Sequence, residues 1–116
     1  MIYQSNRLFS IFSYSMSHGL LLLRSGKSKL HPTRVDILFT DVRGLELRAL
    51  LEGLTIEEVT PDYTRERSSR PNALIEIGNK VYRVSSDGWE GFVVGGIVRI
   101  HEDDGKLMEP SHLIET

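Results

Sequence analysis

Turn dipeptides divide residues 73 to 108 into short apolar runs. The dipeptides are Gly78-Asn79, Asp87-Gly88 and Asp104-Gly105. A two-residue β-hairpin needs residues that adopt positive φ angles, and Asn, Asp and Gly do so most readily. The spacing therefore predicts a β-meander, an antiparallel sheet in which tight turns join neighbouring strands.

The turns also predict which way each side chain points. In a two-residue hairpin the residues that flank the turn face each other across the ladder. Counting outward predicts a core face that carries Ala73, Ile75, Ile77, Tyr82, Val84, Trp89 and Val93. The opposite, mixed face carries Leu74, Glu76, Val81, Arg83, Glu90, Phe92 and Val94. We expect this mixed face to be partly solvated or half covered by another element.

The alternation changes after Val94. Continued unchanged, it would turn Arg99 into the core and point Val98 and Ile100 away from it. Because an unpaired buried charge is costly, we predict a β-bulge at Gly95-Gly96 that returns Val98 and Ile100 to the core.

Earlier in the chain, residues 19 to 24 are predicted to form a strand buried on both faces, and residues 34 to 40 a second strand. A basic loop, residues 25 to 33, joins them. Residues 41 to 53 fit a short helix, because leucines recur at helical spacing up to Leu54. The alternative is an extended run, since Leu45 and Leu47 alternate with Glu46 and Arg48.

Residues 1 to 15 are polar and aromatic without a clean period. We expect them to be an extension outside the domain, with a single β-rich domain over residues 16 to 116 and a natural start at Met16. A signal peptide is disfavoured because only Arg7 precedes the apolar stretch. The four leucines from Leu20 to Leu23 are too few to cross a membrane.

Together these patterns predict a mainly β protein. We expect an antiparallel β-sandwich or a bent meander sheet of about seven strands with at most one short helix. An α+β fold is the alternative.

The composition excludes several functions. The chain has no cysteine, which removes disulfides, thiolate metal sites and thiol nucleophiles and favours the cytoplasm. A net charge of -2 disfavours a dedicated nucleic-acid binder. Gly26-Lys27-Ser28 is like the end of a phosphate-binding loop, but it lacks the upstream glycine and the following helix, so no cofactor is expected.

His101-Glu102-Asp103-Asp104 is the densest group of potential metal ligands. Strand alternation puts His101 and Asp103 on one side and Glu102 on the other, so a site would need help from His31 or His112. The metal candidates are His101, Asp103 and Asp104, and the oxygen-rich set favours a hard cation over zinc. They support the alternative function, a small metal-dependent or hydrolytic enzyme.

No catalytic triad or nucleophile elbow can be identified, so no catalytic residue is predicted and a binding domain is favoured over an enzyme. Its partner is expected to be a protein or a second copy of the chain, with no membrane contact. The candidate contact residues come from the mixed face and from a basic segment. They are Leu74, Arg83, Phe92, Arg65, Arg67 and Arg70.

A family resemblance points the same way. The run from Val35 to Val42, then Leu45 and Leu47, then Gly53-Leu54-Thr55-Ile56 and the meander, resembles small all-β bacterial proteins of unknown function. Some proteins of that group are immunity proteins against toxins. The resemblance implies a non-catalytic domain that binds one protein partner or itself.

Overall fold

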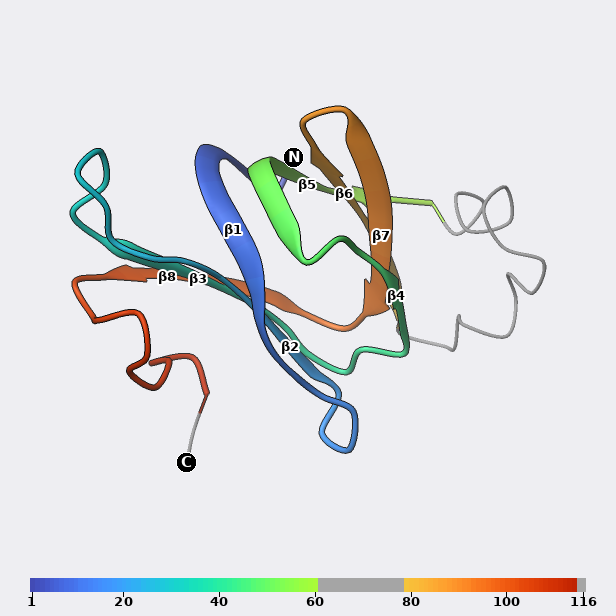
Figure 1. The fold of residues 1–116 in the computed structure, drawn as a ribbon. Helices are drawn as coiled ribbons and strands as arrows, with labels where there is room; N and C mark the ends of the chain where they lie inside the picture. Colours follow the sequence, from blue (N-terminus) through green and yellow to red (C-terminus); the bar gives the residue numbers. More distant parts are fainter. Residues whose placement is uncertain (61–78, 115–116) are drawn as a thin grey trace.

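The computed structural model describes residues 1 to 60 and 79 to 114. In these residues the chain forms one antiparallel sheet of eight strands and no helix (Figure 1). The strands are β1 (Tyr3–Ser15), β2 (Leu20–Ser25), β3 (Arg34–Phe39), β4 (Gly44–Glu46), β5 (Leu50–Val59), β6 (Lys80–Ser86), β7 (Trp89–Gly95) and β8 (Val98–Asp103). The prediction of a mainly β protein with a bent antiparallel sheet is confirmed. No helix in the described residues is long and apolar enough to cross a membrane.

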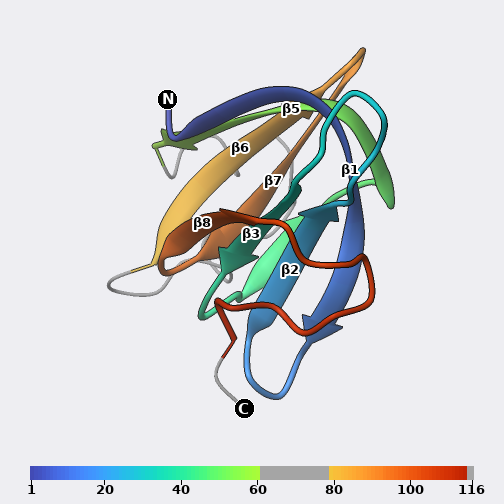
Figure 2. The same ribbon diagram turned by 90° about the vertical axis from the view of Figure 1, so that its left-hand side faces the viewer.

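The strand order is β4-β7-β6-β5-β1-β2-β3-β8. The strand at one end of the sheet, β4, follows β3 in the chain, and the strand at the other end, β8, follows β7. The chain runs from β3 into β4 and from β7 into β8, while β3 pairs with β8 and β4 pairs with β7. The segment made of β3 and β4 therefore pairs along its length with the segment made of β7 and β8. The sheet curls until it closes around the core, as Figures 1 and 2 show.

The predicted bulge lies where β7 bends into β8. Two residues face one here: the Gly96 amide donates to the Thr40 carbonyl, and the Ile97 carbonyl accepts from the Thr40 amide. A Cβ atom on Gly95 would lie 2.9 Å from the Thr40 carbonyl oxygen. Glycine is therefore needed at residue 95 because the two segments approach closely, and the positive φ at this bend belongs to Asp41 instead.

The bulge resets the alternation only partly as predicted. Val98 packs against the core, as expected. Ile100 shares its side of the sheet but remains exposed, because only β3 flanks this part of β8. The expectation that Ile100 is buried is therefore wrong.

The register around Asp87-Gly88 is confirmed. Ser86 faces Trp89, Val84 faces Gly91 and Tyr82 faces Val93. On the predicted core face, Tyr82, Val84 and Val93 are buried and Trp89 packs against them. The other predicted core residues of this region are Ala73, Ile75 and Ile77. They lie outside the described residues, as does Gly78 of the predicted Gly78-Asn79 turn.

The mixed face is more buried than predicted. Val81, Phe92 and Val94 form a second apolar cluster, against which Val59 packs. Phe92 is 4% exposed, so the expectation that it offers a free contact surface is wrong.

Two other predicted elements differ from the structure. Residues 41 to 53 are extended, because β4 pairs with β7 and β5 pairs with β1 and β6; the helix prediction is wrong and its extended alternative is right. Asp104-Gly105 does not turn a hairpin. β8 ends at Asp103, and residues 104 to 114, called the tail below, have no regular secondary structure.

Residues 3 to 15, which we expected outside the domain, form the longest strand, between β5 and β2. The register of β1 shifts between Ser5 and Leu8 against β5, and again between Ile11 and Ser13 against β2. Such shifts break the period-two pattern that identifies a strand in sequence. A natural start at Met16 stays a prediction.

We predict that Phe9→Ala lowers the free energy of unfolding by about 3 to 5 kcal/mol, because Phe9 is fully buried in the core. Leu8→Ala is the matched control: Leu8 is exposed, so its removal should change stability by only about 0.5 kcal/mol. Urea denaturation of both variants measures the difference. Equal stability of the two variants would show that β1 is not part of the core.

Candidate functional site

The outer face of β2, β3 and β8 carries a ladder of charged side chains. Arg24 of β2 faces Asp36 of β3, which in turn faces His101 of β8. One step along, Arg34 of β3 faces Asp103 of β8. Because directly opposed residues project to the same side of a sheet, these five side chains share one face.

Two ion pairs form within this ladder, the first buried and the second partly buried. Arg24 Nε donates to Asp36 Oδ1 at 2.7 Å and its Nη2 donates to Oδ2 at 3.0 Å. Arg34 binds Asp103 in the same two-pronged way, with both bonds at 3.0 Å. Arg24, Arg34 and Asp36 are each 1% exposed. The parallel geometry makes these pairs strong and fixes the orientation of each carboxylate.

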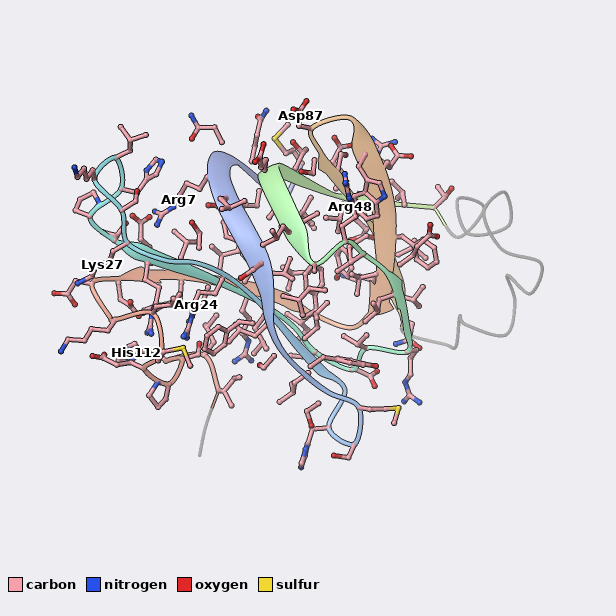
Figure 3. All side chains as sticks on the ribbon, in the orientation of Figure 1. Arg7, Arg24, Lys27, Arg48, Asp87 and His112 are labelled. Atoms are coloured by element: carbon pink, nitrogen blue, oxygen red, sulfur yellow. The ribbon has the colours of Figure 1, made fainter. Side chains whose placement is uncertain are left out.

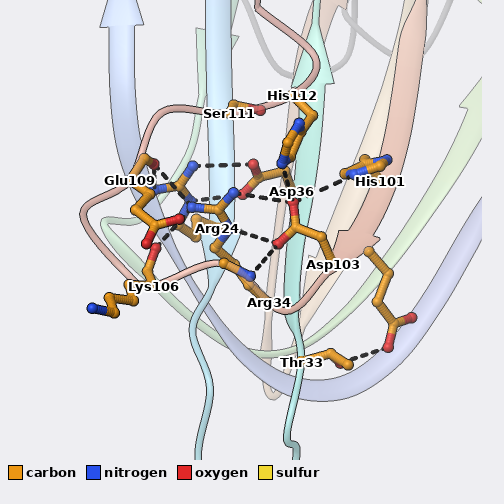
Figure 4. Close-up of polar contacts among 12 residues, drawn as sticks. Arg24, Thr33, Arg34, Asp36, His101, Asp103, Lys106, Glu109, Ser111 and His112 are labelled. Atoms are coloured by element: carbon orange, nitrogen blue, oxygen red, sulfur yellow. Dashed lines mark hydrogen bonds and ion pairs between the residues drawn. The ribbon is translucent and has the colours of Figure 1, made fainter.

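The remaining N–H groups of the two arginines bind the tail. Arg24 Nη1 donates to the carbonyls of Leu107 and Glu109, and Arg34 Nη1 donates to those of Lys106 and Glu109 at 2.8 and 2.9 Å. These contacts add to the tail's own backbone hydrogen bonds, from the Glu109 amide to the Lys106 carbonyl and from the Ile114 amide to the Ser111 carbonyl. They hold it across the outer face of the sheet (Figures 2 and 4).

The Arg34 pair also determines the charge state of Asp103. Hydrogen bonds from Arg34, with a smaller contribution from the Gly105 amide, hold the pKa of the Asp103 carboxyl below its usual value, although burial opposes this shift. The same pair raises the pKa of Arg34. Asp103 is therefore an anion near neutral pH.

Two histidines point at this carboxylate. His101 Nε2 lies 3.4 Å and His112 Nε2 lies 3.6 Å from Asp103 Oδ2 (Figure 4). His101 comes from β8, whereas His112 comes from the tail. His112 is brought here by the path of the chain after Asp103, and it is one of the two histidines that the sequence analysis named as possible helpers.

Of the sequence-predicted metal candidates, the structure brings His101 and Asp103 together and leaves out Asp104. Within residues 1 to 60 and 79 to 114, the residues whose ligand atoms lie within 4.8 Å of one another are His101, Asp103 and His112. Glu102 binds Thr33 instead, with the Thr33 hydroxyl donating at 2.6 Å. The set therefore holds two ring nitrogens and one carboxylate oxygen.

A groove of about 310 Å³ lies beside the tail. Leu8 of β1, Leu50 of β5 and Leu107 of the tail line it, and they are 53%, 61% and 52% exposed. Lys27 and His31 lie on its polar side. Sequence reasoning missed this groove because it placed Leu8 outside the domain, Leu50 in a helix and Leu107 in a hairpin.

Arg7 holds the loop that forms the polar side of the groove. Its Nε donates to Ser25 Oγ and its Nη1 to Thr33 Oγ1, each at 3.1 Å, which joins the two ends of the loop. Arg7, Arg24, Lys27 and His112 lie at the same end of the molecule (Figure 3).

The predicted contact residues are placed differently. Arg83 is held by Glu57 at 2.6 Å, with Glu90 3.8 Å away. Phe92 is buried, as described above. The others, Leu74, Arg65, Arg67 and Arg70, lie outside the described residues.

Comparisons of the chain with protein-family models, with curated proteins and with solved structures found no match.

We predict that Asp36→Asn lowers the free energy of unfolding by about 3 to 5 kcal/mol, because it leaves the Arg24 charge buried without its partner. Glu58→Gln makes the same chemical change in the exposed pair with Lys80 and should have an effect of at most about 1 kcal/mol. Thermal and urea unfolding of both variants give the comparison. A stable Asp36→Asn protein would mean that the buried pair is dispensable.

Proposed function

We propose that this protein is a non-catalytic binding domain and that its groove receives an acidic segment of a partner protein. One observation carries the proposal: Leu8, Leu50 and Leu107, from three separate parts of the chain, are exposed around a single hollow. Scattered exposed leucines are ordinary, but an apolar patch at one concave place is typical of a contact site.

The charges around the groove support an acidic partner. Residues 1 to 40 carry five Lys and Arg residues and one acid, Asp36. Arg24 and Arg34 are already paired with carboxylates inside the protein. Lys27 and Lys29 are exposed and give the loop beside the groove a positive charge, which would attract Asp and Glu residues of a partner.

The resemblance to toxin-immunity proteins agrees with such a role, and immunity to one toxin would be a specific form of it. The cysteine-free sequence favours the cytoplasm as its compartment. The alternative expectation is a metal-dependent or hydrolytic enzyme that uses His101, Asp103 and Asp104. The structure groups His101 and Asp103 with His112 and leaves Asp104 out.

A displayed library of random peptides tests the proposal. We expect it to enrich peptides with an apolar side chain next to Asp or Glu, and we expect amide shifts at Leu8, Leu50 and Lys27 when such a peptide is added to the ¹⁵N-labelled protein. Leu50→Ser and Lys27→Glu should each weaken binding about tenfold or more. Leu30→Ser is the matched control, because Leu30 is 86% exposed and does not line the groove.

Failure to enrich any peptide, or shifts that map to another face, would overturn the proposal. Sedimentation of the protein alone tests self-association. A dimer that Leu50→Ser dissociates would show that the groove is occupied by a second copy of the chain instead of a separate partner.

A further inference from the structure

We propose that His101, Asp103 and His112 form a binding site for a divalent cation of the zinc type. Each residue offers one ligand atom, and these atoms lie within 4.8 Å of one another. The Nε2 atoms of His101 and His112 lie 3.4 and 3.6 Å from Asp103 Oδ2. Two of the residues come from β8 and the third from the tail, so the cation would join the tail to the sheet.

The spacing of the atoms suits a shared cation better than direct hydrogen bonds. The two nitrogen-to-oxygen distances, 3.4 and 3.6 Å, exceed the usual range for an N–H···O bond, about 2.7 to 3.2 Å. Two ligands on a tetrahedral zinc ion, with bonds of about 2.0 to 2.1 Å, are separated by about 3.3 to 3.4 Å. Asp103 Oδ2 and each imidazole are therefore close to the separation that one zinc ion requires.

The hydrogen bonds of the Asp103 carboxylate leave one lone pair, on Oδ2, without a donor. Its Oδ1 accepts from Arg34 Nε at 3.0 Å and from the Gly105 amide at 2.8 Å, which fills both lone pairs. Its Oδ2 accepts from Arg34 Nη2 at 3.0 Å, so a single lone pair remains for two imidazole nitrogens. A cation between the three groups would satisfy all of them, and carboxylates that bind a metal are usually held by hydrogen bonds of their own, as Asp103 is here.

The donor set selects the cation. Two imidazoles and one carboxylate match zinc and similar transition metals, whereas calcium and magnesium prefer oxygen ligands. The expectation of a hard cation therefore changes once His112 replaces Asp104 in the set. His112 is exposed along most of its side chain, so its ring can move the short distance needed to close the site. The fourth position is left for water.

The test is titration of tag-free, metal-stripped protein with ZnCl₂, followed by calorimetry and by the melting temperature. We expect one zinc ion per chain and a rise in melting temperature that EDTA reverses, with no such rise from MgCl₂. His112→Ala should weaken zinc binding more than about a hundredfold, since losing a ligand costs more than the 10- to 100-fold lost with an outer partner. His18→Ala is the control, because His18 is not one of the three clustered residues and its Nδ1 lies within hydrogen-bond distance of the Ser15 and Ser17 hydroxyls.

The exposed position of His112 makes its removal compatible with folding, and the circular dichroism spectrum checks this. Absence of saturable zinc binding by the unmodified protein would overturn the proposal. Binding that His112→Ala leaves unchanged, or that His18→Ala removes, would also overturn it. The groove plays no part in this test, so Leu50→Ser should bind zinc as tightly as the unmodified protein.

Discussion

The pairs that the buried Arg24 and Arg34 form with carboxylates are the interaction on which the rest of this molecule depends. Removing an ion from water costs several kcal/mol even in real proteins, so a buried pair persists only if its geometry is good and its other hydrogen-bonding groups are satisfied. Arg24 and Arg34 have such geometry: each binds a carboxylate through two bonds and donates further hydrogen bonds to carbonyls of the tail. The tail is thus part of the fold, although it has no regular secondary structure.

The docked tail builds both candidate sites. It contributes Leu107 to the groove and His112 to the histidine cluster, and the same two arginines hold it in place between them. Closure of the sheet also helps to build the histidine cluster. The bend at Gly95-Gly96 directs β8 onto β3, and this pairing puts Asp103 opposite Arg34. The close approach that glycine allows at residue 95 thereby determines which charged residues face each other on the outer face.

The parts of the fold that could be predicted are those specified by neighbouring residues. The Asp87-Gly88 turn determined the register of β6 and β7, and the conflict between Arg99 and the alternation located the bulge. The wrong predictions concern segments whose structure depends on residues distant in sequence. β1 lost its alternation through two register shifts, and the helix predicted over residues 41 to 53 was excluded by pairing with strands distant in sequence. The leucine spacing in residues 41 to 53 suits a helix as well as a strand, and pairing with distant strands decided between them.

In the candidate site, too, the features specified by neighbouring residues were predicted and those that depend on distant residues were not. Strand alternation correctly put His101 and Asp103 on one side, because that inference needs only the local period of two. The choice of His112 as the third ligand needed the path of the tail. That path depends on the buried guanidinium groups of Arg24 and Arg34, whose contacts with the tail the strand pattern does not indicate. Replacing Asp104 by His112 changes the donor set from mostly oxygen to mostly nitrogen. The chemistry expected of the cluster is therefore decided by how Arg24 and Arg34 are buried, and not by the His-Glu-Asp-Asp run itself.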